Sequence, residues 1–410
     1  MVARRTAALW GVVLVLVTAV LTWGLATWTE GGPPPAGWGA AAHLLRSPEA
    51  ASLVDGLTLI SEHYLRTPDM AQVDQAALQA AVASLRDPYS AYLTPAAYSA
   101  LRSSASGQYS GIGIEVEEQA GGVVVRAILP GTPAAETSYV GAPAGAAPGL
   151  AAGDRLLRVD GRAVFGMTPS AVRAAVVGAP GTLVQLEVDR GGRTLTFLLR
   201  RQTITTASVV ARMLSPGVGY IRVRSFAAGT PAQFAAAVGQ LRAKGMQRLV
   251  LDLRDNPGGL LSSALGVARW ILPPGVVTYL QPRSGPRQAY RLTSTHPLGI
   301  PYAVLVNGQT ASAAELLAGA IQDDHAAPLV GERTYGKGLV QQVFPLPDGG
   351  ALRLTVAQYL TPDGRDVNGT GVAPDQVVPF PAATPQQLGN PATDPQLAAV
   401  LRWLARQAAA

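Results

Sequence analysis

The spacing of apolar residues changes twice along the chain, and this limits the folds that it can adopt. Residues 46–106 carry apolar side chains at helical spacing, residues 107–200 alternate as short β-strands around one helix, and the later residues alternate between strands and helices. This order predicts an α+β multidomain protein with a helical region, a β-rich domain and an αβ core in which helices cover a sheet. We assign residues 201–380 to the core and residues 381–410 to a C-terminal helical tail.

The first 30 residues predict a membrane anchor. Arg4 and Arg5 precede 23 uncharged residues, which as a helix would span about 34 Å, enough to cross a hydrocarbon layer of about 30 Å. No clear small-residue cleavage site follows, so the pattern favours an uncleaved signal anchor over a cleaved signal peptide. The arginines would hold the amino terminus in the cytoplasm and place the rest of the chain outside the cell membrane, periplasmic or in the cell envelope. Residues 31–45, rich in Pro and Gly, form the expected linker.

Composition excludes several kinds of chemistry. The chain has no Cys and four His, which rules out disulfides, thiolate zinc sites and a cysteine nucleophile, and argues against a multi-histidine metal centre. The net charge of +6 comes from scattered arginines without a long basic run, so it does not indicate nucleic-acid binding. Only Lys244 and Lys337 are lysines among the 32 basic residues. Where the chain keeps a lysine, the site can require a property that arginine lacks.

Ser312 lies where a buried strand, Tyr302 to Val306, gives way to a predicted helix. A serine at a helix start is usually an N-cap, and Glu315 three residues later would complete a capping box. A serine in this position can also present its hydroxyl beside free backbone N–H groups, as an acyl-transfer nucleophile requires. The local pattern leaves both interpretations open.

Lys337 favours the second interpretation. It stands between two glycines, in a chain that uses arginine almost everywhere else. A desolvated lysine can act as the base for a serine nucleophile, whereas the guanidinium of arginine stays protonated. Gln341, four residues later, carries an amide that could hold the lysine in place.

Two histidines are the alternative bases. His325 follows Ser312 by thirteen residues along a predicted helix, which places it about 15–20 Å away, so a capping or surface role is the better interpretation. Nothing in the sequence around His296 argues for catalysis.

The turn Asn256-Pro257-Gly258-Gly259 follows a second buried strand. Paired glycines let backbone N–H groups approach a ligand closely, although the same pattern also makes a simple turn. In the functional interpretation, Gly258 or Gly259 forms an oxyanion hole together with the N–H of Ser312 or Ala313.

The chain after residue 45 resembles the carboxyl-terminal processing proteases, or tail-specific proteases, of bacterial type. The similar segments occur in the family's order: Asp87–Leu93, Ser110–Ile114, Leu253–Gly259, Thr310–Glu315, Gly331–Gln341, Gly371–Asp375 and Asp394–Leu397. The resemblance implies a catalytic Ser–Lys dyad assisted by Gln, carried here by Ser312, Lys337 and Gln341, without metal or cofactor. It also implies a PDZ domain over residues 107–200. Its carboxylate-binding loop would be Ser110, Gly111, Ile112, Gly113 and Ile114.

Two departures from the family pattern stand out. Ala314 replaces a second serine that usually follows the nucleophile by two residues, and a missing hydroxyl there should not stop the dyad. Residues 137–149 are extra residues within the PDZ-like region, either a harmless surface loop or one that alters peptide docking.

The sequence therefore predicts an anchored serine endopeptidase that recognises the C-terminal tails of unfolded or tail-exposed proteins. The alternatives are a catalytically inactive PDZ scaffold and a Ser–His hydrolase of small esters. The intact set of Ser312, Lys337 and Gln341 favours the peptidase. A regulatory partner or a homo-oligomer is left open.

Overall fold

The computed structural model describes residues 47–380 and 387–407. The described chain divides into two compact units between Ala80 and Ala81. The predicted anchor, residues 1–30, and linker, residues 31–45, lie outside the described residues. In the part that the structure describes, no helix is long and apolar enough to cross a membrane.

The first segment forms two helices, as the helical spacing of its apolar residues predicts. Helix α3, Pro48–His63, has Ser47 as its N-cap, whose hydroxyl accepts a hydrogen bond from the Ala50 N–H at 3.2 Å. Helix α4, Met70–Ala83, begins directly after Asp69, whose carboxylate accepts hydrogen bonds from the N–H groups of Ala71 and Gln72 in the first turn. No residue of α3 is buried.

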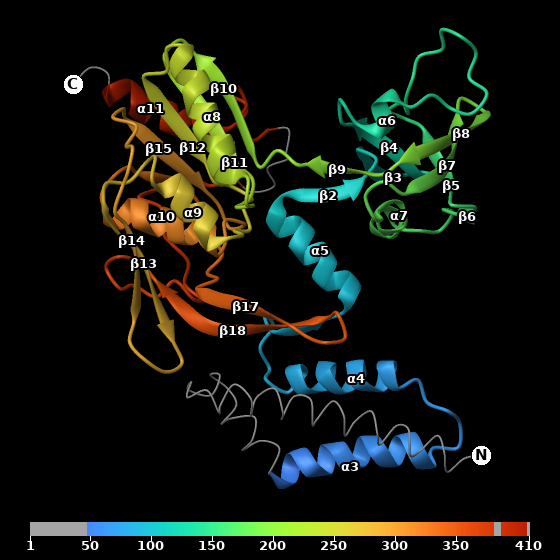
Figure 1. Cartoon of the computed structure of the whole chain (residues 1–410). Helices are drawn as coiled ribbons and strands as arrows, with labels where there is room; N and C mark the ends of the chain where they lie inside the picture. Colours follow the sequence, from blue (N-terminus) through green and yellow to red (C-terminus); the bar gives the residue numbers. More distant parts are fainter. Residues whose placement is uncertain (1–46, 381–386, 408–410) are drawn as a thin grey trace, which may run out of the picture. The chain divides into compact units, whose positions relative to one another are not determined.

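A two-stranded ribbon connects the segments immediately before and after the β-rich domain. Helix α5, Pro95–Ser106, ends at Gly107 and leads into β2, Gln108–Gly111. Strand β2 pairs antiparallel with β9, Gln202–Thr205, through which the chain leaves the domain on the same side (Figure 1). The segments through which the chain enters and leaves the domain are therefore hydrogen-bonded to each other.

The β-rich domain is a sheet with strand order β3-β4-β5-β7-β8 and with β6 beside β5. Its elements are β3 Ile114–Gln119, β4 Gly122–Ile128, α6 Pro133–Glu136, β5 Arg155–Val159, β6 Arg162–Ala163, α7 Pro169–Val176, β7 Leu183–Arg190 and β8 Arg193–Arg200. The alternating residues 111–116 do not form one continuous strand, because the chain turns at Gly113, which has a φ of 88° and lies against the Thr132 side chain. Strands β3 and β8 are the two edges of the sheet, and α7 packs beside β3.

The αβ core is built on a sheet with strand order β10-β11-β12-β15-β16-β19. Strand β10 is antiparallel to β11, and the other neighbours are parallel. The strands are β10 Val209–Ser215, β11 Val218–Val223, β12 Arg248–Asp252, β15 Tyr302–Val306, β16 Leu329–Gly331 and β19 Gln376–Val377.

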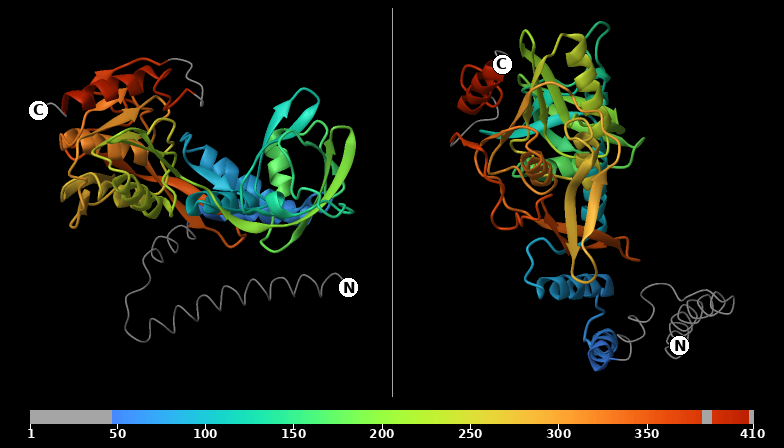
Figure 2. Two further views of the ribbon diagram at one scale, coloured as in Figure 1. Left: turned by 90° about the horizontal axis from the view of Figure 1, so that it is seen from above. Right: turned by 90° about the vertical axis from the view of Figure 1, so that its left-hand side faces the viewer.

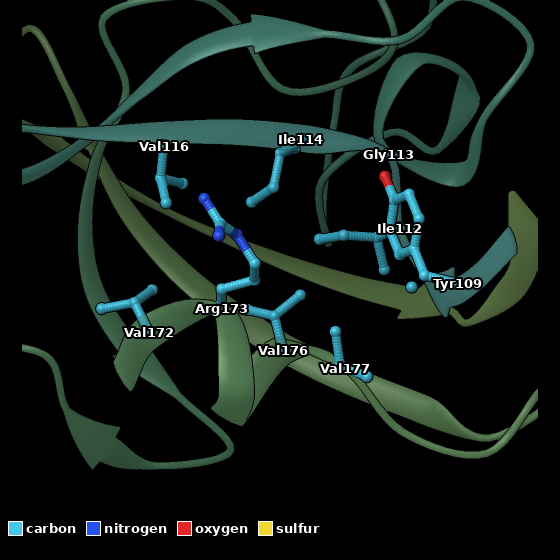
Figure 3. Close-up of a pocket in the computed structure, with 10 residues that line it drawn as sticks. Tyr109, Ile112, Gly113, Ile114, Val116, Val172, Arg173, Val176 and Val177 are labelled. Atoms are coloured by element: carbon cyan, nitrogen blue, oxygen red, sulfur yellow. The ribbon is translucent and has the colours of Figure 1, made fainter. Parts of the chain in front are cut away.

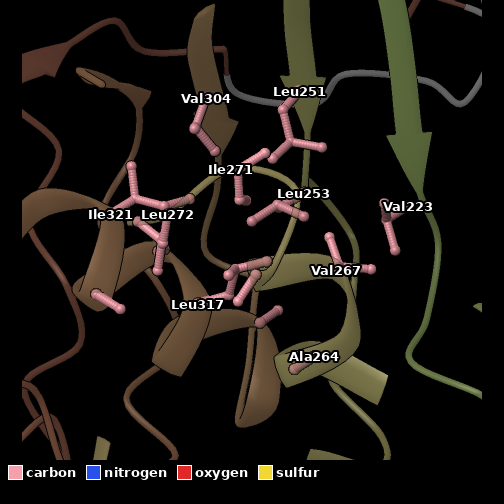
Figure 4. Close-up of a cluster of buried hydrophobic side chains, with 14 of the residues drawn as sticks. Val223, Leu251, Leu253, Ala264, Val267, Ile271, Leu272, Val304, Leu317 and Ile321 are labelled. Atoms are coloured by element: carbon pink, nitrogen blue, oxygen red, sulfur yellow. The ribbon is translucent and has the colours of Figure 1, made fainter. Parts of the chain in front are cut away.

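Helices cover both faces of this sheet. Helices α8 Thr230–Ala243, α9 Leu261–Ala268 and α10 Ala313–Asp323 supply one core cluster, in which Leu317 and Val267 pack near Leu251 and Val304 (Figure 4). Helix α11, Pro395–Gln407, covers the other face through Leu397 and Val400, and Figure 2 shows it in red on the far side of the sheet. Burial on both faces explains why these strands are almost continuously apolar.

A second sheet was not anticipated from the sequence. Strands β13 Gly275–Pro282, β14 Gln288–Leu292, β17 Leu339–Pro345 and β18 Ala351–Leu360 form it together with β1, Ala91–Leu93. Because β1 pairs with β18, the segment before β1 lies beside the strands that follow Lys337.

Candidate active site

The candidate nucleophile Ser312 lies in a strained turn. It is the N-cap residue of α10 and has a φ of 55° and a ψ of −121°, a conformation that non-glycine residues rarely adopt. Its side chain is almost fully buried. Strained backbone of this kind persists only where the surrounding structure enforces it, and it is common at functional sites.

The strand ends bring Ser312 beside the double-glycine turn. Strands β12 and β15 are parallel neighbours, so the loops that follow them lie at the same edge of the sheet. The Asn307 side chain joins the loops, since it accepts a hydrogen bond from the Asp255 N–H at 3.0 Å and donates one to the Asp255 carboxylate at 2.8 Å. The Ala311 N–H donates to the Asn256 carbonyl at 2.9 Å.

Gly258 packs directly against the nucleophile. A Cβ atom added to it would lie 2.9 Å from the Ser312 Cβ and 2.9 Å from the Ala313 nitrogen. Its own N–H donates to the Asn256 side chain at 2.9 Å, so it is already engaged.

The neighbouring Gly259 is placed differently. The Phe226 N–H donates to the Gly258 carbonyl, and the Leu260 N–H donates to the Phe226 carbonyl. These two bonds pair Gly259 with Phe226 as in a parallel bridge, which turns the Gly259 N–H away from Phe226. Of the two predicted glycine donors of the oxyanion hole, Gly259 therefore fits better than Gly258.

Glu315 links the nucleophile to the lysine segment, a function that the sequence analysis missed because it considered this residue only as a capping partner. Its carboxylate is fully buried. It accepts hydrogen bonds from the Ser312 N–H at 2.9 Å and the Lys337 N–H at 2.8 Å. It also accepts from the Gly336 N–H at 2.6 Å and the Thr334 hydroxyl at 2.5 Å. Four donors satisfy the buried charge, and one side chain thus fixes both backbones.

Lys337 has the environment of a lysine that loses its proton readily. Burial lowers the pKa of its ammonium, the nearby Arg353 lowers it further, and Asp87 and Glu315 oppose the shift. The ammonium lies 4.9 Å from the centre of the Tyr89 ring. Among the described residues, no hydrogen bond joins this ammonium to the Ser312 hydroxyl.

Tyr359 is a second neighbour of the nucleophile that the sequence analysis did not find. Burial raises the pKa of its hydroxyl, and a side-chain hydrogen bond with Ser312 opposes this shift. Its N–H donates to the Gly338 carbonyl at 2.7 Å, beside Lys337. Tyr359 belongs to β18, one of the unpredicted strands, which explains why no sequence motif pointed to it.

Gln341 lies on β17, where its amide donates to the Thr355 hydroxyl of β18 at 3.2 Å. No hydrogen bond within the described chain joins it to Lys337. Its predicted assistance to the lysine stays a prediction.

The two histidines lie apart from this arrangement. His325 follows the last turn of α10, whose eleven residues span about 16 Å from Ser312. The His296 N–H donates to the Arg269 carbonyl at 2.7 Å, and its ring lies beside Trp270. In the described part of the chain, neither histidine forms a hydrogen bond with Ser312.

A second candidate site is a groove between β3 and α7 (Figure 3). Its lining residues are Tyr109, Gly111, Ile112, Gly113, Ile114, Val116, Val172, Arg173, Val176 and Val177. Four residues of the predicted carboxylate-binding loop line it, and the fifth, Ser110, lies in β2 opposite Thr203. The Ser110 hydroxyl is buried without a hydrogen-bond partner in the described structure.

The extra residues 137–149 attach to the opposite edge of the same sheet. Tyr139 packs edge-on against Phe197 with ring centres 6.1 Å apart, and the Val140 N–H donates to the Thr196 carbonyl of β8 at 2.8 Å. None of these thirteen residues is among those that line the groove. The segment is a surface loop on β8.

Comparison with known proteins agrees with this geometry. The sequence model of Peptidase family S41 matches residues 217–378, and that of the PDZ domain matches residues 110–200. A carboxyl-terminal-processing protease of Synechocystis sp. is 36% identical over 312 residues, which cover 74% of this chain and 70% of that protein. The chain belongs to the carboxyl-terminal-processing protease family.

Other comparisons are consistent with this assignment. A carboxyl-terminal-processing protease of Picosynechococcus sp. is 37% identical over 314 residues, covering 75% of this chain and 73% of the relative. A Bacteroides fragilis structure assigned to the S41 proteases superimposes with a TM-score of 0.52 at 18% identity, over 85% of this chain and 96% of that one, which supports the fold alone. The predicted family is confirmed, as are the enzyme class, a serine-type peptidase, and the combination of a PDZ domain with an αβ peptidase core.

Proposed function

We propose that this chain cleaves proteins that it recognises by their C-terminal tails, with Ser312 as nucleophile and Lys337 as general base. The observation that carries the proposal is the Glu315 carboxylate, which binds the backbone N–H groups of both residues. A buried side chain shared in this way holds the two segments in one site. The strained backbone of Ser312 and the lowered pKa of Lys337 support the same assignment.

In this mechanism, neutral Lys337 takes the proton from the Ser312 hydroxyl, and the oxygen attacks the scissile carbonyl carbon. The N–H groups of Gly259 and Ala313 stabilise the resulting oxyanion. The ammonium of Lys337 then gives its proton to the leaving amine as the peptide bond breaks. Water, deprotonated by the same lysine, hydrolyses the acyl-enzyme and restores Ser312. For the first step, the Lys337 side chain has to swing from the Tyr89 ring to the serine.

The groove of the PDZ domain supplies tail recognition. Strand β3 is an edge strand, so a substrate tail can pair with it as an additional strand. The tail's carboxylate would then lie at the Ser110–Ile114 loop, and its apolar side chains would face Val172 and Val176 of α7.

The cellular place of this activity rests on the amino-terminal sequence. Arg4 and Arg5 followed by 23 uncharged residues support an anchor in the cell membrane with the peptidase on its outer side. A groove that binds C-terminal tails would let such an anchored enzyme act on the exposed ends of proteins outside the membrane.

Peptide cleavage by the purified full chain tests the proposal. We expect the wild type to cut an unstructured peptide with an apolar C-terminus and to cut it more slowly when its carboxylate is amidated. Ser312→Ala should bind the peptide with unchanged affinity and leave it intact. A wild-type enzyme that binds the tail without cutting it would contradict the proposal and favour a PDZ scaffold.

A further inference from the structure

The groove between β3 and α7 contains one charged side chain among the described residues that line it. That residue is Arg173 of α7, and the others are glycine, apolar residues and Tyr109. Figure 3 shows its guanidinium between α7 and β3, beside Ile114 and Val116. The Arg173 side chain is exposed, and it forms no ion pair or hydrogen bond with a described residue. An unpaired guanidinium therefore faces the place where a peptide would lie.

The acidic residues of β3 do not neutralise this charge. Glu115 pairs with Arg126, and the Glu117 carboxylate accepts a hydrogen bond from the Gln119 amide at 2.8 Å. Glu118 is exposed at the far end of the strand and, within the described structure, forms no ion pair with Arg173. The groove thus keeps a local positive charge within an otherwise apolar lining.

The Arg173 guanidinium lies where one particular side chain of a bound tail would be. A tail whose carboxylate lies at the loop before β3 must run antiparallel to that strand, and alternate side chains then face α7. The last side chain would lie near Ile112, with Tyr109 and Val177 beside it. The side chain two positions earlier would lie at the level of Ile114 and Val116, where the guanidinium is.

We infer that this groove selects tails with Asp or Glu at the third position from the C-terminus, and that Arg173 is the residue that binds this acidic side chain. This inference rests on the proposed tail recognition and adds a substrate class to it. A carboxylate there can accept charge-assisted hydrogen bonds from the guanidinium. Because Arg173 is exposed, water screens the pair, and we expect a preference of about five- to tenfold over a neutral side chain.

Fluorescence anisotropy with the full chain carrying Ser312→Ala, which cannot consume the peptide, measures this preference. Three labelled peptides differ only in having Asp, Asn or Lys at the third position from the end. We expect affinity to fall from Asp to Asn to Lys. In Arg173→Glu the order should reverse. Arg162→Glu, a charge reversal at an exposed arginine of the same domain outside the groove, should leave the order unchanged.

The outcomes separate this inference from the proposed function. Equal affinity for all three peptides, together with loss of binding on amidation, would overturn the role of Arg173 while leaving tail recognition intact. Binding that does not depend on the free carboxylate would overturn tail recognition itself. Uniformly tighter binding to Arg173→Ala would show that the side chain only covers the groove, which also contradicts the inference.

Discussion

At the scale of single residues, the site depends on one carboxylate that touches neither substrate nor leaving group in the mechanism. Glu315 holds the backbone of Ser312 and of Lys337 through separate hydrogen bonds. It is therefore a positioning residue. Its importance follows from burial, because a buried acceptor that is removed leaves several donors unsatisfied.

Glu315→Gln tests this role. The amide offers one acceptor oxygen in place of two, so some of the N–H groups of Ser312, Gly336 and Lys337 lose their partner. We expect kcat/KM for a tail peptide to fall at least tenfold and the free energy of unfolding to fall by about 2–3 kcal/mol. Peptide cleavage and urea denaturation measure the two effects. Glu49→Gln, at an exposed position of α3, should change neither.

The pH dependence of cleavage tests the environment of Lys337. Only the neutral amine can act as base, so activity rises with pH through the pKa of Lys337, which burial and Arg353 lower. Arg353→Gln removes the neighbouring cation, and the pKa should rise. The rising limb of kcat/KM should therefore move to higher pH.

Arg291→Gln, at an exposed position, provides the control for this profile and should leave the limb in place. If the rising limb of the Arg353→Gln profile stays at the same pH or moves to lower pH, the effect of Arg353 on the pKa of Lys337 is contradicted. This result would mean that a group other than Lys337, or a lysine insensitive to Arg353, governs the rate.

At the scale of elements, a buried charge cluster ties α11 to the strand that leads into the double-glycine turn. Arg254 is fully buried and pairs with Asp252 at 2.6 Å and with Asp394 at 2.7 Å. The Tyr220 hydroxyl donates to Asp252 at 2.6 Å, and Gln396 accepts from Arg254 at 2.9 Å. The C-terminal Asp394-Pro395-Gln396 motif thus anchors α11 at the end of β12.

Asp394→Ala should be severely destabilising. It removes one carboxylate from a buried arginine, and breaking a buried pair in this way costs about 3–5 kcal/mol. Urea denaturation should show this loss. Glu115→Ala, which breaks the exposed pair with Arg126, should cost under about 1 kcal/mol. Equal effects of the two changes would contradict the structural role of the cluster.

The sequence predicted best the elements whose pattern is strong and local. The strand β15 and the helix α10 after Ser312 were found at or near their true bounds, since a buried apolar run fixes the strand and a cap fixes the helix start. The sheet of β13, β14, β17 and β18 was missed. Its strands mix polar and apolar residues and are only partly buried, so their pairing over long separations leaves little local signal.

At the scale of the whole molecule, the same limit applies to the candidate site. Lys337 was visible in the sequence because it is a rare lysine, and Ser312 because a serine follows a buried strand at a helix start, a pattern that became decisive only beside Lys337 and the family motifs. Glu315, Tyr359 and Tyr89 were not found as site residues, because their roles depend on contacts between segments far apart in the chain. Seven motifs in order identified the family, whereas the distances among them needed the fold.

The proposed mechanism requires that a lysine serve as the base of a serine peptidase. Lys337→Arg tests it most directly, because it keeps the positive charge and removes the group that can become neutral. Lys244→Arg, the same substitution at the chain's other lysine, is the matched control. We measure kcat/KM for a tail peptide with both variants. We expect Lys337→Arg to lose activity by about a thousandfold or more while Lys244→Arg matches the wild type. Appreciable turnover by Lys337→Arg would show that Lys337 is not the base.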